Sequence, residues 1–336
     1  MMESKDIAHT SKRMKLAIFN GLPYHFEMYG YILHYCNVNG HTLTIYSRDD
    51  THNWIEFYTK LFPSLQWKSV NLFLREYTGY DFIIVTTDDD RGFPLQNANN
   101  VICIDHRFNV RRPSVDPFYH IATRPFAVNL RKWALPCYPI VQSVQDKIAH
   151  LKSVDGVHIV VLGSMDYHIN RINRLTSPSK ITLHFVSRQV GKEKLSLLRK
   201  KFNVRVYENV PTHTMMDMLY KSQYMICDVH TNDDHTNGVS MSGSIPLAFS
   251  TLNQLIISDT NNSFFTFTSP KVFSLNSSET INLTETLNED TLTNIYNERE
   301  RLVSMFHAHM NEIVHTPRKA PAAGTASPVS PWTFRV

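Results

Sequence analysis

The segment from Asp217 to Asp259 restricts the fold more than any other part of the chain. It contains a helix end, an apolar run YMICDV, a polar loop HTNDDHTNGVSM, a small-residue stretch SGSIPLAFSTLNQ and a second apolar run LIISD. Continuous apolar runs of this length indicate strands buried on both faces of a parallel sheet. The segment therefore predicts a strand–helix–strand unit of an α/β fold. Its polar loop would follow the carboxyl end of a strand, where ligands bind in such sheets.

The sequence Ser242-Gly243-Ser244 stands at the expected start of the helix in this unit. Free N–H groups at a helix start can bind phosphate, and a glycine there lets a ligand approach the backbone. The two hydroxyls can also donate to an anion. The alternative is that Ser242 only caps the helix.

Further apolar runs of strand length occur in two successive series, each alternating with helical patterns. The first series is Lys15–Phe19, His41–Tyr46, Tyr80–Thr87 and Asn100–Asp105, and the second is His158–Leu162, Lys180–Val186, Val204–Tyr207 and Tyr224–Val229. Two such series predict an α/β protein with two Rossmann-like, doubly wound domains that face a cleft. We expect a disordered lead over 1–13, a first domain over 14–140, a second over 141–315 and a loose tail over 316–336.

Composition narrows the class of protein further. The chain has 336 residues, 42% of them hydrophobic, which is enough for two domains, and its net charge of +4 does not indicate a nucleic-acid partner. The four cysteines lack the spacing of a metal or disulfide motif. No apolar run is long enough to cross a membrane and the first residues lack the apolar core of a secretory signal, so we expect a cytoplasmic protein. Peripheral contact with a membrane surface stays open.

The region 107–139 is rich in proline, arginine and aromatic residues and is expected to be irregular. Its basic residues are Arg107, Arg111, Arg112, Arg124, Arg131 and Lys132. They could bind an anionic acceptor or a nucleic-acid backbone. A solvated segment between the domains is the favoured interpretation.

Two groups of acidic and histidine side chains could in principle bind a metal. Asp88-Asp89-Asp90 closes a strand and resembles the metal motif of the single-domain glycosyltransferase architecture. His230, Asp233, Asp234 and His235 lie together in the long polar loop. Solvated turn carboxylates are commoner than metal ligands, and the loop lacks the fixed spacing of a metal motif. We therefore expect no metal site.

The order of these signals resembles one known family. The first strand is followed by Asn20-Gly21-Leu22-Pro23, and a later one contains Tyr80-Asp81-Phe82-Ile83. The strand NVICID is followed by His106, and HIVVL by Gly163-Ser164. The stretch VRVYENVPTHTMMDMLYKSQYMICDV and the strand LIISD complete the series. Over 14–314 this pattern is similar to glycosyltransferases of the GT-B architecture, as a divergent member of the group around glycosyltransferase family 4.

The resemblance implies transfer of a hexosyl or pentosyl unit from a nucleotide sugar to a carbohydrate or glycoconjugate acceptor, without cofactor or metal. The acceptor would lie on the first domain, beside the loop of Asn20 and Gly21, with His106 and His25 as catalytic candidates. The alternative for each histidine is a capping or loop-supporting role. The donor diphosphate would be held by residues of the second domain: Gly163, Ser164, Arg171, Ser242, Gly243 and Ser244, with Arg174 as an alternative cation.

The chain also departs from the family pattern. Ser164 stands where many retaining members have an arginine, and no acidic residue occurs between Asp234 and Asp259, where many have two glutamates. Two alternatives therefore stay open. One is a binding protein that keeps the architecture without activity, and the other is an enzyme similar to the nucleotide-sugar epimerases.

Overall fold

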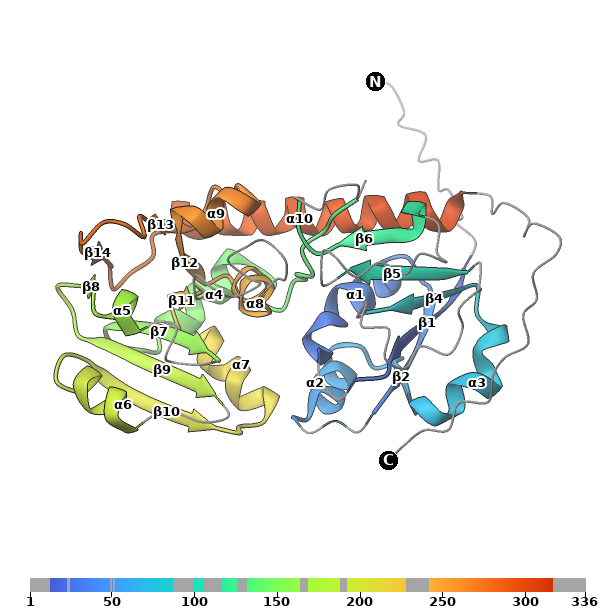
Figure 1. The fold of residues 1–336 in the computed structure, drawn as a ribbon, viewed down its shortest axis with the longest axis horizontal. Helices are drawn as coiled ribbons and strands as arrows, with labels where there is room; N and C mark the ends of the chain where they lie inside the picture. The colour runs from blue at the N-terminus through green and yellow to red at the C-terminus, as the bar shows by residue number, and fades with distance from the viewer. Residues whose placement is uncertain are drawn as a thin grey trace, which may run out of the picture.

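Two parallel six-stranded sheets form the framework of the protein (Figure 1). The computed structural model describes residues 13–22, 25–48, 50, 52–86, 100–105, 117–125, 132–163, 169–187, 192–227 and 242–316. In spatial order, the first sheet contains β3 (Gln66–Ser69), β2 (Thr42–Ser47), β1 (Lys15–Asn20), β4 (Phe82–Val85), β5 (Val101–Asp105) and β6 (His120–Ala122). The second contains β10 (Asn203–Glu208), β9 (Ile181–Ser187), β7 (Val157–Leu162), β11 (Tyr224–Ile226), β12 (Gln254–Ser258) and β13 (Lys271–Phe273).

Both sheets have the same strand order, in which the chain starts in the middle, moves to one edge and then returns to build the other side. This is the doubly wound arrangement, and it confirms the predicted fold class. The central strands are apolar because they are covered on both faces. In the first sheet Ile18 pairs with Ile45 on one side and Ile84 on the other, and all three are fully buried.

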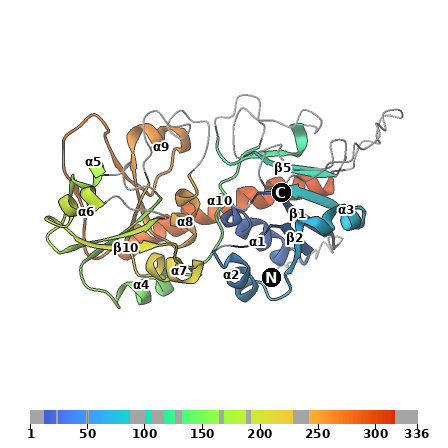
Figure 2. The same ribbon diagram turned by 60° about the horizontal axis from the view of Figure 1, so that its bottom comes forward.

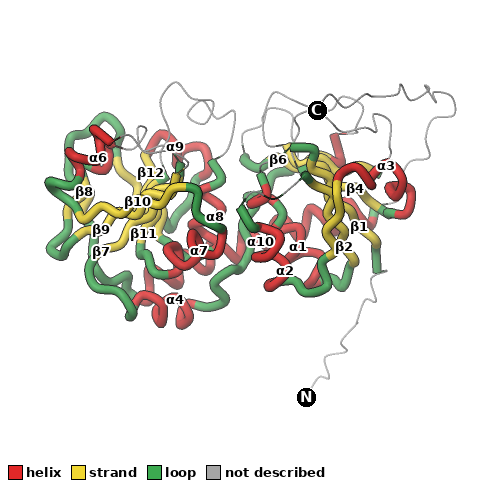
Figure 3. The backbone as a smooth tube through the Cα atoms, turned by 90° about the horizontal axis from the view of Figure 1, so that it is seen from below, coloured by secondary structure: helices red, strands yellow, loops and turns green. Residues whose placement is uncertain are grey.

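Helices cover the two sheets (Figures 1 and 3). The first domain has α1 (Gly30–Val38), α2 (Trp54–Leu61), α3 (Phe73–Glu76) and the short 3-10 turns η1 (Phe26–Met28), η2 (Val70–Leu72), η3 (Tyr77–Gly79) and η4 (Pro117–Tyr119). The second has α4 (Val144–Leu151), α5 (Ile169–Ile172), α6 (Lys192–Leu198), α7 (Thr212–Tyr220), α8 (Ser244–Ser250) and α9 (Asp259–Phe265). A small two-stranded sheet joins β8 (Leu175–Thr176) and β14 (Ile281–Asn282).

The long helix α10 (Glu289–His315) runs along both domains (Figure 1). It begins at Asn288, whose side chain accepts from the N–H of Thr291 at 2.8 Å. Its first half packs against α4 and α8 of the second domain. Its second half reaches the first domain, where the ring of Phe306 lies 4.2 Å from that of Tyr31. The predicted division at 140/141 stays a prediction, but α10 physically joins the parts on either side of it.

Two buried basic side chains, Lys147 and Arg299, hold neighbouring segments of the chain together. Lys147 on α4 is fully buried, and its ammonium donates to the carbonyls of Leu219 and Tyr220 at the end of α7. Burial holds the pKa of Lys147 well below its usual value. Arg299 on α10 is also fully buried and donates to the carbonyl of Val141. Both side chains therefore donate hydrogen bonds to backbone carbonyls that have lost their contact with water.

The region 107–139 differs in part from expectation. Among its described residues, His120–Ala122 form the edge strand β6, which is too short to be recognised as an apolar run. Arg124 and Lys132 are 3% and 5% exposed, so the expected solvated character is wrong for these two residues. Lys132 donates to the carbonyl of Phe118 and lies 3.8 Å from the centre of its ring.

In the described part of the chain, no helix is long and apolar enough to span a membrane.

Candidate functional site

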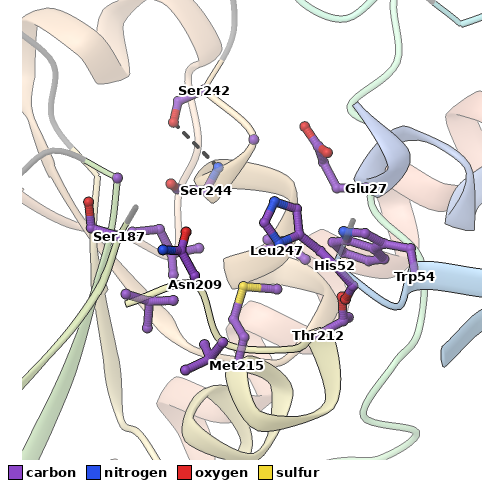
Figure 4. Close-up of a pocket in the computed structure, with 15 residues that line it drawn as sticks. Glu27, His52, Trp54, Ser187, Asn209, Thr212, Met215, Ser242, Ser244 and Leu247 are labelled. Atoms are coloured by element: carbon purple, nitrogen blue, oxygen red, sulfur yellow. Dashed lines mark hydrogen bonds between the residues drawn. The ribbon is translucent and has the colours of Figure 1, made fainter. Parts of the chain in front are cut away.

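A pocket of about 390 Å³ lies between the two domains. Its second-domain side consists of the carboxyl ends of β7, β9 and β10 and the segments that follow them, together with the starts of α7 and α8. In an open parallel sheet this edge binds ligands because the connecting loops diverge there. Its first-domain side is formed by Glu27, His52 and Trp54 (Figure 4). The pocket therefore belongs to both domains.

The second domain gives the pocket an apolar part and a polar part. The apolar residues are Leu162, Val186, Val210, Met215 and Leu247. The polar side chains are those of Ser187, Asn209, Thr212, Ser242 and Ser244. An apolar lining with a few convergent polar groups is typical of sites that bind small molecules.

Ser242, Gly243 and Ser244 all line this pocket, as does Gly163. The hydroxyl of Ser242 accepts from the N–H of Ser244 at 3.3 Å, but the N-cap of α8 is Gly243, which makes no side-chain cap, so Ser242 is not the helix cap that was the alternative to phosphate binding. Gly163 has a φ of 89°, a left-handed conformation that suits glycine at the sharp turn after β7. The sequence thus identified two of the segments that line the pocket in the second domain, and their role toward a diphosphate stays a prediction.

Glu27 approaches the serine-glycine segment from the other domain. A Cβ atom added at Gly243 would lie 3.2 Å from Oε1 of Glu27, so any side chain there would press against this carboxylate. Nδ1 of His25 lies 3.3 Å from the same oxygen. Both side chains are about a quarter exposed, at 25% for His25 and 24% for Glu27. His25 itself is not among the lining residues, so it reaches the pocket through Glu27.

The remaining residues predicted for the site lie elsewhere or outside the described residues. Asn20 is fully buried, donates to the hydroxyl of Tyr29 at 2.8 Å and accepts from the N–H of Leu22, and neither it nor Gly21 lines the pocket. Arg171 lies on α5 and does not line the pocket. The alternative cation, Arg174, donates to the carbonyls of Ser274 and Glu279 instead.

Several expectations fall outside the described residues. They are His106, Ser164, the triplet Asp88–Asp90 and the loop group His230, Asp233, Asp234 and His235. Within the described ranges, no group of histidine, cysteine or acidic side chains is arranged to hold a metal ion.

Sequence reasoning missed Glu27, His52, Trp54 and Asn209. Signals for some of them were present. His52 lies between β2 and α2, and Asn209 follows β10 directly, so both come after the carboxyl ends of strands. The rule that identified Ser242 would therefore have pointed to them as well. Glu27 had no such signal, because only the packing of the two domains brings it to Gly243.

Comparison with known proteins supports the fold. No protein-family model matches the sequence, and no curated protein is detectably similar to it. Among solved structures, AviGT4, a glycosyltransferase involved in avilamycin A biosynthesis, superposes with a TM-score of 0.54 at 10% identity, over 91% of this chain and 100% of that one. HepE from Anabaena in complex with UDP-glucose gives 0.53 at 10% identity, over 90% and 98%. These likenesses show a shared fold, the two-domain GT-B architecture.

Proposed function

We propose that this chain is a glycosyltransferase that moves a hexosyl or pentosyl unit from a nucleotide sugar to a carbohydrate or glycoconjugate acceptor. The observation that carries the proposal is the interdomain pocket, which combines an apolar second-domain wall with polar groups from both domains. HepE, which shares the fold, is seen in complex with UDP-glucose and with UDP and glucose, and this supports a nucleotide sugar as the ligand. A divergent likeness to the group around glycosyltransferase family 4, with an inverting instead of a retaining outcome, and a cytoplasmic location remain part of the proposal. Peripheral contact with a membrane surface stays open.

The donor lies on the second domain. Its base packs on the apolar residues, and its diphosphate lies beside Gly163 and the Ser242–Ser244 segment, with Ser164 and Arg171 as further candidates from the sequence. Backbone N–H groups and hydroxyls compensate the charge that develops on the leaving diphosphate. The reaction needs no cofactor or metal in this proposal.

Glu27 is the general base. It accepts the proton of an acceptor hydroxyl while that oxygen attacks the anomeric carbon, and the bond from this carbon to the diphosphate oxygen breaks. The configuration of the sugar is inverted. The position of Glu27 supports this role, because it faces Gly243 from the first domain, where the acceptor is expected. His25 beside it orients the carboxylate, and His106 remains a candidate acceptor contact.

Two measurements test the proposal. Nucleoside diphosphates and nucleotide sugars should raise the unfolding temperature of the purified chain by mass action. Glu27→Gln should then lower the release of nucleoside diphosphate from a nucleotide sugar by about a hundredfold or more while binding is kept, since general bases contribute factors of this size. Glu56→Gln, an exposed glutamate on α2 that does not line the pocket, is the matched control.

Each outcome separates the candidates. Release at the wild-type rate in Glu27→Gln would remove Glu27 from the chemistry. Binding without release or transfer would indicate a binding protein, and conversion of the sugar without any acceptor would indicate an epimerase-like enzyme. If no nucleotide changes the unfolding temperature, the proposed donor is wrong.

A further inference from the structure

His52, which lies between β2 and α2 of the first domain, is hydrogen-bonded to the second domain. The carbonyl of His52 accepts from both the N–H of Thr212 at 2.9 Å and its hydroxyl at 2.6 Å. Thr212 is the first residue of α7, and Pro211 before it gives the helix no side-chain cap. The first N–H groups of a helix have no partner within the helix. The first domain therefore supplies a hydrogen-bond acceptor at the start of α7, at the border of the pocket.

The position of His52 is fixed by its own loop. The carboxylate of Asp50 accepts from the N–H of His52 at 3.1 Å and from that of Ile55 at 2.6 Å. Asn53 has a φ of 61°, a left-handed conformation that asparagine adopts more readily than most residues other than glycine. Trp54 is 6% exposed, and its ring stacks on that of Tyr58 at 5.4 Å.

Two parts of His52 thus act on the same small region of the second domain. While its carbonyl holds Thr212, its imidazole projects into the pocket that Val210 and Met215 also line (Figure 4). Asn209, with a φ of 52°, lines the pocket and is left-handed like Asn53, which lies outside the pocket wall. Helices α2 and α7 lie in contact at this junction (Figure 2). A ligand that packs on Val210 and Met215 would therefore lie in the same pocket as the imidazole of His52.

We propose that His52 is a nucleoside-contacting residue supplied by the first domain. Its imidazole, which can donate and accept hydrogen bonds, binds the polar edge of the heterocycle or the ribose of a ligand whose flat face packs on Val210 and Met215. This inference rests on the proposed function, because it assigns a residue to the nucleotide of that reaction. A ligand bound in this way touches both domains. Nucleotide binding therefore favours the domain arrangement described above, in which Thr212 is hydrogen-bonded to the carbonyl of His52.

The test uses the full chain and uridine, guanosine and adenosine 5′-diphosphates, titrated by calorimetry. His52→Ala should weaken the binding of the best of these about tenfold, as expected for a lost hydrogen bond in a partly buried site. The bond to Thr212 involves the backbone carbonyl of His52, so the substitution leaves it in place and the unfolding temperature without ligand should change little. His213→Ala, an exposed neighbour of Thr212 outside the pocket, is the control and should bind as the wild type does.

Hydrogen exchange gives a second readout that a purely structural role would not move. In the wild type, the same nucleotide should slow exchange both in the first-domain segment 48–54 and at the start of α7. In His52→Ala the protection of segment 48–54 should be lost. Unchanged affinity in His52→Ala, or a wild type in which only the second domain is protected, overturns this inference and leaves the proposed function standing. A wild type that binds none of the three nucleotides overturns both.

Discussion

Replacing Gly30 by alanine tests how tightly the first domain is packed against the segment that joins the two sheets. A Cβ atom at Gly30 would lie 2.0 Å from Cε1 and 2.2 Å from Cζ of Tyr138. Nonbonded carbon atoms need about 3.5 to 4.0 Å, so the ring of Tyr138 or helix α1 has to move by roughly 1.5 Å. Tyr138 is 1% exposed, and its ring lies 6.3 Å from that of Tyr58, so it has little space to move into.

Two effects of Gly30→Ala oppose each other. Alanine favours a helix over glycine by at most about 1 kcal/mol, and Gly30 is the first residue of α1. Overpacking of a filled core costs about 1 to 3 kcal/mol, and more where neither side can move. We therefore expect a net loss of about 1 to 3 kcal/mol in the free energy of unfolding. Glu27 precedes Gly30 by only three residues, so a shift of α1 should displace the proposed general base. The rate at which nucleoside diphosphate is released from a nucleotide sugar should therefore fall as well.

Urea unfolding followed by fluorescence measures this loss. Gly79→Ala is the matched control, because a Cβ atom there would meet nothing within 4 Å, and its effect should stay within about 0.5 kcal/mol. If Gly30→Ala unfolds at the same urea concentration as the wild type or a higher one, the packing of Tyr138 on α1 is not as the structure describes.

The remaining predictions concern pH and the pocket. Burial, with a histidine neighbour in each case, lowers the pKa of His184 and His307 to about 4. Their contribution to the free energy of unfolding is complete above pH 6.5, the usual histidine pKa, and is lost as the pH falls toward 4. Between pH 6.5 and 5 the loss is at most about 2 kcal/mol for the buried His184 and smaller for the more exposed His307. The urea concentration at the midpoint of unfolding should be lower at pH 5 than at pH 7.5, and His184→Gln should reduce this difference. A midpoint that does not change with pH would contradict the buried, neutral state of these histidines. Ser244→Asp places a carboxylate in the pocket and should abolish the rise in unfolding temperature with UDP, because like charges repel. Ser196→Asp, at an exposed position, is the control and should keep this rise. An unchanged rise in Ser244→Asp would exclude a diphosphate beside Ser244.

The sequence determined the fold class and pointed to part of the second-domain side of the pocket. Continuous apolar runs such as FIIV in β4 and VICID in β5 can be buried on both faces only in a covered parallel sheet, and the structure has two such sheets. The place of a loop after the carboxyl end of a parallel strand pointed to the Ser242–Ser244 segment. Gly163 came from the resemblance to the GT-B glycosyltransferases, and it lines the pocket as well. Short edge strands such as β6 carry too few residues for a pattern and were missed.

Tertiary structure decided which side chains face the pocket. Asn20 follows the first strand as expected for a site residue, but its side chain turns to the hydroxyl of Tyr29, which no pattern along the chain could show. Glu27 and His52 enter the pocket because α10 and the segment around Tyr138 hold the two domains against each other. Local sequence fixes the order and burial of strands through short-range periodicity. The meeting of Glu27 with Gly243 depends on packing between residues more than two hundred positions apart.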